Sequence, residues 1–157
     1  MSSFKKIILT TDLSANAEIA FPYAIDLAKR YDGVVYIVNV FEDRVYYDST
    51  IEPSWFDNAQ RERERIVSDR VGQMADAGVT AVPVVLEGSA AQEIVRFAKS
   101  EKADIIVIGT HGRTGFSHFF FGSVAERVMR LSPCPVLTVR TEEVKRTDDH
   151  HHAHESH

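Results

Sequence analysis

Glycines spaced along residues 109–123 give the strongest indication of chemistry in this sequence, which there reads Gly-Thr-His-Gly-Arg-Thr-Gly-Phe-Ser-His-Phe-Phe-Phe-Gly-Ser. The segment continues directly from the apolar run 105–108. Glycine lets a backbone turn through positive φ and approach an anion with no Cβ in the way. A helical pattern begins at Gly122 and Ser123, and the first N–H groups of a helix attract negative charge. The segment therefore predicts a loop that binds phosphate.

Two well-known phosphate loops would imply different chemistry, and the sequence contains neither of them. It has no Gly-x-x-x-x-Gly-Lys-Ser/Thr, so no lysine is placed for transfer of a β- or γ-phosphate, and no Gly-x-Gly-x-x-Gly follows the first apolar run. The spacing is instead Gly109, two residues, Gly112, nine residues, Gly122 and then the hydroxyl of Ser123. This spacing matches neither of the two loops.

The elements that would position this loop follow from the alternation of short apolar runs with longer segments of helical period. That alternation predicts a parallel β-sheet covered by helices on both faces, and hence an α/β fold. Strands are expected near 5–10, 34–40, 80–86, 104–109 and 135–139. Helices are expected near 15–31, 55–77, 89–101 and 122–131, with Pro22 kinking the first. Expected caps are Ser14, Ser89 in a capping box with Gln92, and the glycines Gly33 and Gly78 after two helix ends.

Composition narrows the class of protein further. The chain has 157 residues with 44% hydrophobic content, which suits one domain with a sizeable core. Its formal net charge of -5 argues against a nucleic-acid partner. The single cysteine, Cys134, excludes an internal disulfide and fits a reducing compartment, and no apolar run suggests a signal peptide or a membrane partner. We expect a cytoplasmic protein.

Three segments fit neither strand nor core helix. The connection 41–54 is long enough to be a lid over a ligand or a disordered loop, and both interpretations stay open. The charge run 61–65 is expected to be a solvated helix face. Residues 141–157 are expected to form a disordered tail. The tail carries histidines that could bind a transition metal only adventitiously, namely His150, His151, His152, His154 and His157.

Taken in order, several segments resemble the universal stress protein family over roughly residues 4–140. The similar segments are 6–14, 103–115, 122–130 and 134–139. The resemblance implies one doubly wound domain, residues 1–140, of the Rossmann-like or adenine nucleotide alpha hydrolase-like type. Its five-stranded parallel sheet would have the order 3-2-1-4-5. In that order the strand 135–139 is an uncharged edge, and similar family members pair through it, so we expect a homodimer.

The resemblance also implies a set of nucleotide-binding residues. They are Thr10, Asp12, Val40, Gly109, Thr110, His111, Gly112, Arg113, Thr114, Gly115, Gly122, Ser123 and Val124. The main chain of Val40 would read the adenine edge, and Arg113 would supply charge to a phosphate unless it is a solvated loop arginine. Asp12 is the candidate ligand for Mg²⁺, and its alternative role is to orient the turn into the first helix. Phe119, Phe120 and Phe121 are expected to pack rather than to stack on adenine.

The function that the resemblance implies is binding of ATP, or of another adenine nucleotide, with Mg²⁺ as an optional companion. Rapid hydrolysis needs a positioned water, a base and charge neutralisation at the γ-phosphate, and the sequence offers only the cradle. We therefore assign no catalytic residue and favour a nucleotide-dependent regulatory or stress-response module. One alternative is a slow ATPase or nucleotide-phosphate transferase. The other is a structural interaction protein with a vestigial loop, against which the intact glycines argue.

Overall fold

A single parallel sheet organises the computed structural model, which describes residues 3–42, 52–110 and 122–140. Within these residues the strand order is β3-β2-β1-β4-β5, which confirms the expected order. The strands are β1 (Lys6–Thr10), β2 (Val34–Phe41), β3 (Thr80–Glu87), β4 (Ile105–Gly109) and β5 (Val136–Val139). Each strand begins and ends within one residue of its expected range. The order reverses direction at β1, so the carboxyl ends of β1 and β4 border the crevice where open α/β sheets bind ligands.

The central strand β1 shows why its sequence is apolar without alternation. Ile7, Ile8 and Leu9 are each 0% exposed because helices cover both faces of the sheet. Leu9 pairs with Ile37 of β2 and with Val107 of β4. The hydrogen bonds to β2 and β4 therefore fix the register of β1, and with it the position of Thr10 at the end of the strand.

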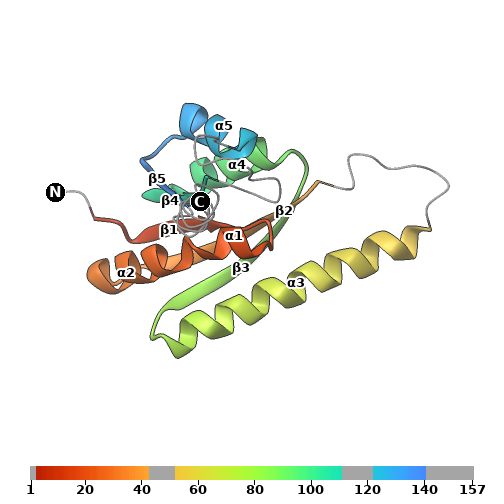
Figure 1. Ribbon diagram of the computed structural model, residues 1–157, viewed down its shortest axis with the longest axis horizontal. Helices are drawn as coiled ribbons and strands as arrows, with labels where there is room; N and C mark the ends of the chain where they lie inside the picture. Colours follow the sequence, from red (N-terminus) through yellow and green to blue (C-terminus); the bar gives the residue numbers. More distant parts are fainter. Residues whose placement is uncertain (1–2, 43–51, 111–121, 141–157) are drawn as a thin grey trace, which may run out of the picture.

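Helices form a layer on each face of the sheet (Figure 1). On one face α2 (Phe21–Tyr31) and α3 (Pro53–Asp76) pack against Ile7, Leu9 and Val35. On the other face α4 (Ala90–Glu101) and α5 (Ser123–Leu131) pack against Ile8 and other strand side chains. The domain is thus doubly wound, as expected, and its core consists of two apolar clusters separated by the sheet.

The helix expected over 15–31 is two helices, and this expectation was wrong. The short α1 (Ala15–Glu18) ends before α2 begins at Phe21. Pro22 lies in the first turn of α2, where its missing N–H costs little. An uninterrupted helix would need that N–H to bond to the carbonyl of Glu18, so proline separates the two helices instead of kinking one.

The turn between α2 and β2 corrects a second expectation. The left-handed residue that ends α2 is Asp32, with φ of 51°, and Gly33 does not have positive φ. A Cβ on Gly33 would lie 2.9 Å from the carbonyl oxygens of both Phe4 and Lys5. Glycine is required here by the close approach of the chain that enters β1. Gly78, after α3, has φ of 84° and fits the expected helix-ending role.

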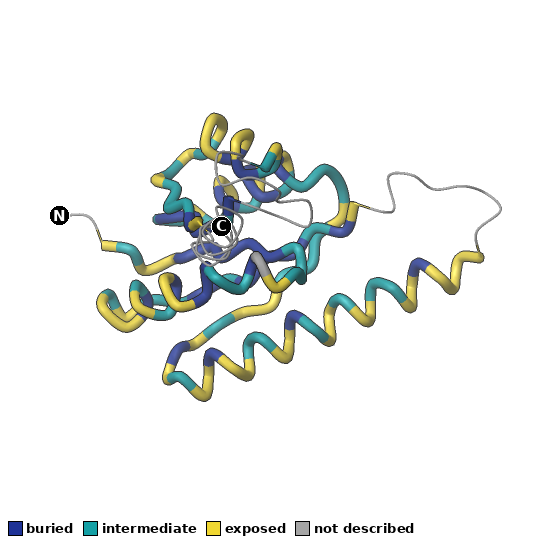
Figure 2. Tube along the Cα trace, viewed as in Figure 1, coloured by how far each residue is buried: buried dark blue, intermediate teal, exposed yellow. Residues whose placement is uncertain are grey.

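The long helix α3 is mostly solvated (Figure 2), and only Phe56, Val67 and Met74 are buried. On its outer side Arg65 pairs with Glu62 at 2.6 Å and with Asp69 at 3.1 Å. The hydrogen bond from Arg65 lowers the pKa of the Glu62 carboxyl, which fits the expected solvated charge run. None of the helices in the described ranges is long and apolar enough to cross a membrane.

Candidate functional site

A cavity of about 260 Å³ lies at the carboxyl ends of β1, β2 and β4. Its wall also includes the first residues of α4 and α5 and one residue of α1. The lining residues are Thr10, Thr11, Asp12, Ala17, Val38, Asn39, Val40, Glu42, Arg63, Ala90, Ile94, Ile108, Gly109, Thr110, Gly122, Ser123, Val124 and Ala125. Its volume is near the lower end of the range of ligand pockets, which begins at roughly 300 Å³.

Eight of the expected nucleotide-binding residues line this one cavity. They are Thr10, Asp12, Val40, Gly109, Thr110, Gly122, Ser123 and Val124. The other five, His111, Gly112, Arg113, Thr114 and Gly115, lie outside the described residues, as do Phe119 to Phe121, most of the connection 41–54 and the tail 141–157. The structure therefore brings the two ends of the glycine-rich segment to the cavity that the sequence predicted, and the binding role of these residues stays a prediction.

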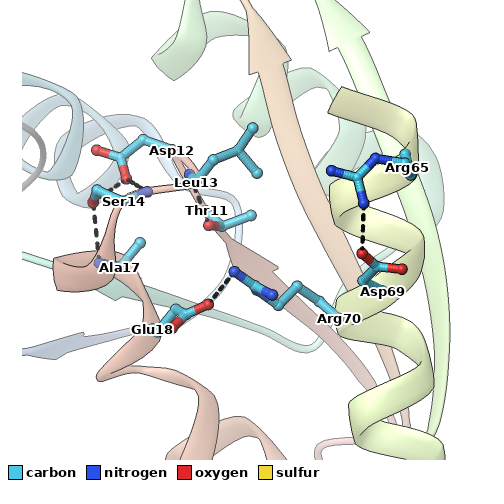
Figure 3. A network of polar contacts seen from close by, with 9 residues as sticks. All are labelled: Thr11, Asp12, Leu13, Ser14, Ala17, Glu18, Arg65, Asp69 and Arg70. Atoms are coloured by element: carbon cyan, nitrogen blue, oxygen red, sulfur yellow. Dashed lines mark hydrogen bonds and ion pairs between the residues drawn. The ribbon is translucent and has the colours of Figure 1, made fainter. Parts of the chain in front are cut away.

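The turn from β1 into α1 is held by its own side chains (Figure 3). The Asp12 Oδ1 atom accepts hydrogen bonds from the backbone N–H of Ser14 at 2.9 Å and from the Ser14 hydroxyl. The Thr11 hydroxyl oxygen accepts from the N–H of Leu13 at 3.0 Å, and the Ser14 Oγ atom accepts from the N–H of Ala17. Leu13 has φ of 69°, a left-handed conformation that leucine rarely adopts. Asp12 thus orients the turn and lines the cavity at the same time.

A carboxylate from the end of β2 caps the amino end of α4. The Glu42 Oε1 atom, just beyond β2, accepts from the N–H of Ala90 at 2.8 Å. Ser89 is the N-cap residue but makes no side-chain hydrogen bond to the helix, so the expected capping box with Gln92 was wrong. A negative charge favours a helix amino end more than a neutral hydroxyl does, and Glu42 supplies that charge from the end of β2, the neighbour of β3 in the sheet.

The amino end of α5 differs from the other two. Its N-cap residue is Gly122, and the described residues supply no side-chain cap. The Gly122 N–H donates to the carbonyl of Thr110 at 2.7 Å, which joins the two ends of the glycine-rich segment. Gly122 has φ of -60° and ψ of 148°, an ordinary extended conformation. Glycine is not needed here for backbone freedom, and it places no side chain over the next amides of α5.

A polar group that the sequence did not point to lies on the β2 wall of the cavity. The buried Asn39 of β2 donates through Nδ2 to the carbonyl of Thr11 at 2.9 Å, and its Oδ1 accepts from Arg63 of α3 at 3.2 Å. The Arg63 guanidinium carbon lies 4.5 Å from the centroid of the Phe41 ring. The alternation of β2 could have identified Asn39, because a polar residue stands there where buried apolar residues alternate on the same face. Nothing in the charge run distinguished Arg63 from its neighbours.

The described side chains of the cavity offer few ligands for a resident metal ion. Asp12 and Glu42 are its carboxylates, and each accepts a backbone N–H bond. Among the residues that the structure describes, no three histidine, cysteine, aspartate or glutamate side chains gather to hold a metal. A Mg²⁺ ion beside Asp12 would therefore depend mainly on oxygens of the ligand and water, as nucleotide-bound Mg²⁺ does.

A doubly wound parallel sheet with a cavity at the carboxyl ends of its central strands defines an open α/β fold, and proteins of this class bind ligands at that edge of the sheet. Comparison with known proteins makes this more specific. The model of the universal stress protein family matches residues 3–140, and the chain belongs to this family. It is 39% identical over 140 residues to a universal stress protein of Methanocaldococcus jannaschii, covering 87% of this chain and 82% of the relative.

Solved structures of the same fold include three members of this family. Universal stress protein UspA from Lactobacillus plantarum superposes with a TM-score of 0.79 at 22% identity, covering 89% of this chain and 100% of that one. An Archaeoglobus fulgidus universal stress protein solved in complex with dAMP has a TM-score of 0.64, 23% identity and coverages of 86% and 97%. An Arabidopsis thaliana family protein solved with AMP bound has a TM-score of 0.62, 17% identity and coverages of 87% and 90%.

Proposed function

We propose that this chain is an adenine-nucleotide-binding regulatory protein of the stress response, acting in the cytoplasm, with ATP as its ligand. The observation that carries the proposal is the contrast among the helix amino ends around the cavity. Ser14 caps α1 and Glu42 caps α4, whereas α5 has no side-chain cap from the described residues. Open amides at a helix amino end bind phosphate readily.

The positions of the strands support one orientation of the ligand, with its phosphates at α5 and its base toward β2. The amino end of α5 lies beside the ends of β4 and β5, joined to them by the bonds from Gly122 to Thr110 and from Thr110 to Val139. Val40 stands on β2, on the other side of β1. Phosphates at α5 therefore place the nucleoside across β1, where the main chain of Val40 can read the adenine edge. The family members solved with AMP and dAMP support an adenine nucleotide.

Binding without efficient turnover agrees with the arrangement of acids in the cavity. Asp12 is engaged by Ser14 in the turn, and Glu42 is engaged by Ala90 at α4. Neither carboxylate is thus set apart to activate a water at a terminal phosphate. Bound nucleotide would instead stabilise one conformation of the chain, and we infer that this conformation is the regulatory output.

Isothermal titration calorimetry with ATP, ADP, AMP and adenosine, each with and without Mg²⁺, tests the proposal. We expect affinity to rise with the number of phosphates, because each added phosphate extends toward the amides of α5. Mass spectrometry of the purified protein under native conditions should detect any adenine nucleotide that co-purifies. Failure of all four ligands to bind would refute the proposed function. ATP hydrolysis through many turnovers would replace it with the ATPase alternative.

We also propose that two copies of the chain pair through β5. This strand pairs with β4 on one side and forms an edge of the described sheet on the other. Met129 and Leu131 of the neighbouring α5 are exposed to 39% and 47%. An uncharged edge strand with exposed apolar side chains beside it favours pairing with a second chain.

A further inference from the structure

Arg63 departs from the solvated charge run in which it stands. Its Nη1 atom donates to Asn39 Oδ1 at 3.2 Å, and its guanidinium lies against the ring of Phe41. Asn39 and Phe41 are two residues apart on β2 and so point to the same face of the sheet. Arg63 therefore has a defined place on the inner side of α3, at the edge of the cavity.

Asn39 connects Arg63 to the turn beside the cavity through hydrogen bonds to both. Its side chain is nearly inaccessible, with 1% exposure, and its Nδ2 donates to the Thr11 carbonyl at 2.9 Å. The N–H of the same Thr11 donates to the carbonyl of Val38 at 2.9 Å. Both polar groups of the Thr11 backbone are thus held by β2. Asp12 follows at once, and its peptide link to Thr11 shares that restraint.

The donor and acceptor groups of Arg63 and Asn39 determine how the Asn39 amide is oriented. A guanidinium can only donate, so Arg63 must meet the oxygen of the Asn39 amide, which turns the amide nitrogen toward the Thr11 carbonyl. Removing the guanidinium leaves a buried amide oxygen without this donor, and such a group is costly to leave unpaired. The amide would then gain by rotating or by admitting water, and either change loosens its hold on Thr11.

We propose that Arg63 is a positioning residue for the nucleoside end of the ligand, acting through Asn39 on the Thr11–Asp12 wall. The inference rests on the proposed function and adds a residue of α3 to the site. Arg63 and Asn39 lie at the β2 side of the cavity, whereas the amino end of α5 lies at the β4 side. We therefore expect replacement of Arg63 to weaken the binding of ligands with one phosphate and with three by the same factor.

The helix supplies a matched control in Arg70. It also points inward from α3, pairing with Glu18 of α1 at 2.5 Å (Figure 3), but it does not line the cavity. We expect Arg63→Met to weaken binding of AMP and of ATP by the same factor, about tenfold, because a partly buried hydrogen bond from a charged donor is lost. Arg70→Met should change both affinities by less than about twofold, since it shares no partner with the site.

Two further variants separate positioning from general damage to α3. Arg63→Lys retains a donor for Asn39 Oδ1 and should recover part of the affinity that Arg63→Met loses. Asn39→Ala removes the intermediate link, so adding Arg63→Met to it should cost little more. Equal losses in the Arg63→Met and Arg70→Met proteins would overturn the proposal. A loss that grows from AMP to ATP would overturn it too, because Arg63 would then act on phosphates.

Hydrogen exchange of the ligand-free protein tests the same inference without any nucleotide. In Arg63→Met the amides of Thr11, Leu13 and Ser14 should exchange faster, whereas Arg70→Met should affect α1 instead. Unchanged exchange across residues 11–14 in Arg63→Met refutes the positioning role even if wild-type protein binds ATP. If wild-type protein binds neither AMP nor ATP, the proposed function fails, and the exchange experiment still decides whether Arg63 orders the turn.

Discussion

One substitution, Gly122→Asp, would add a side-chain cap at the amino end of α5 and should affect folding and binding in opposite directions. Gly122 is the N-cap residue and has φ of -60° and ψ of 148°, so an aspartate fits the existing backbone. Its carboxylate can accept from the following amides of the helix, as N-cap aspartates do. The same carboxylate then occupies the place where we expect a phosphate.

The size of each effect follows from ordinary electrostatics. Replacing an N-cap glycine by aspartate stabilises a helix by a few tenths of a kcal/mol, and charge at the amino end adds about 0.3–1 kcal/mol. Two like unit charges about 5 Å apart repel by about 1–3 kcal/mol at effective dielectric constants between those of water and a protein surface. That repulsion corresponds to a loss of roughly 5- to 150-fold in ATP affinity.

Urea denaturation measures the free energy of unfolding, and calorimetry on the same protein samples measures the affinity for ATP. Gly122→Asn is the matched control, because it has nearly the same size and also caps the helix but carries no charge. We expect Gly122→Asp to be at least as stable as wild type, and to bind ATP more weakly than Gly122→Asn does. Adenosine should bind the Asp and Asn variants alike. If Gly122→Asp binds ATP as well as wild type, phosphate does not lie at α5, and our placement of the ligand is wrong.

Two other predictions concern the fold and the assembly. Gly33→Ala should lower the free energy of unfolding by about 1–3 kcal/mol, because the new Cβ meets backbone carbonyls at 2.9 Å. Gly72→Ala in α3, where a Cβ meets nothing within 4 Å, should raise it by about 0.5–1 kcal/mol, and urea denaturation that gave both variants the same sign would contradict this reasoning. Thr138→Lys places a charge on the β5 edge and should convert a dimer to a monomer in light scattering, whereas a wild-type monomer at micromolar concentration would remove the dimer proposal.

The strands could be predicted from the sequence because burial on both faces leaves a strong pattern. Ile7 to Leu9 and Ile105 to Ile108 are continuous apolar runs, and the structure buries every one of these residues. The order of the strands came from the resemblance to the family rather than from the pattern itself. The described part of the glycine-rich segment was predicted equally well, because Gly109 and Gly122 mark the end of a strand and the start of a helix.

Features that depend on contacts between distant segments could not be predicted. Glu42 caps α4 from 48 positions away, and the local Ser-x-x-Gln pattern at Ser89 predicted a different cap. Arg63 reaches Asn39 across 24 positions, whereas its neighbours in the charge run are solvated. Local patterns report local partners, and only the packing of α3 on the sheet decides which arginine of the run faces inward.

The unpredicted cap from Glu42 adds a negative charge to one end of the cavity. Glu42 puts a negative charge at α4, close to Asn39 and Arg63 on the β2 side, and Asp12 lies between that side and α5. We expect the Glu42 carboxylate to repel a triphosphate from the α4 end of the cavity and the amino end of α5 to attract it, so that the phosphates point toward α5. A neutral base can lie beside Glu42 without that penalty. Glu42→Gln, which keeps an acceptor for Ala90, should therefore leave adenosine binding unchanged and strengthen ATP binding modestly. Equal changes for adenosine and ATP in calorimetry would show that the charge of Glu42 does not orient the ligand.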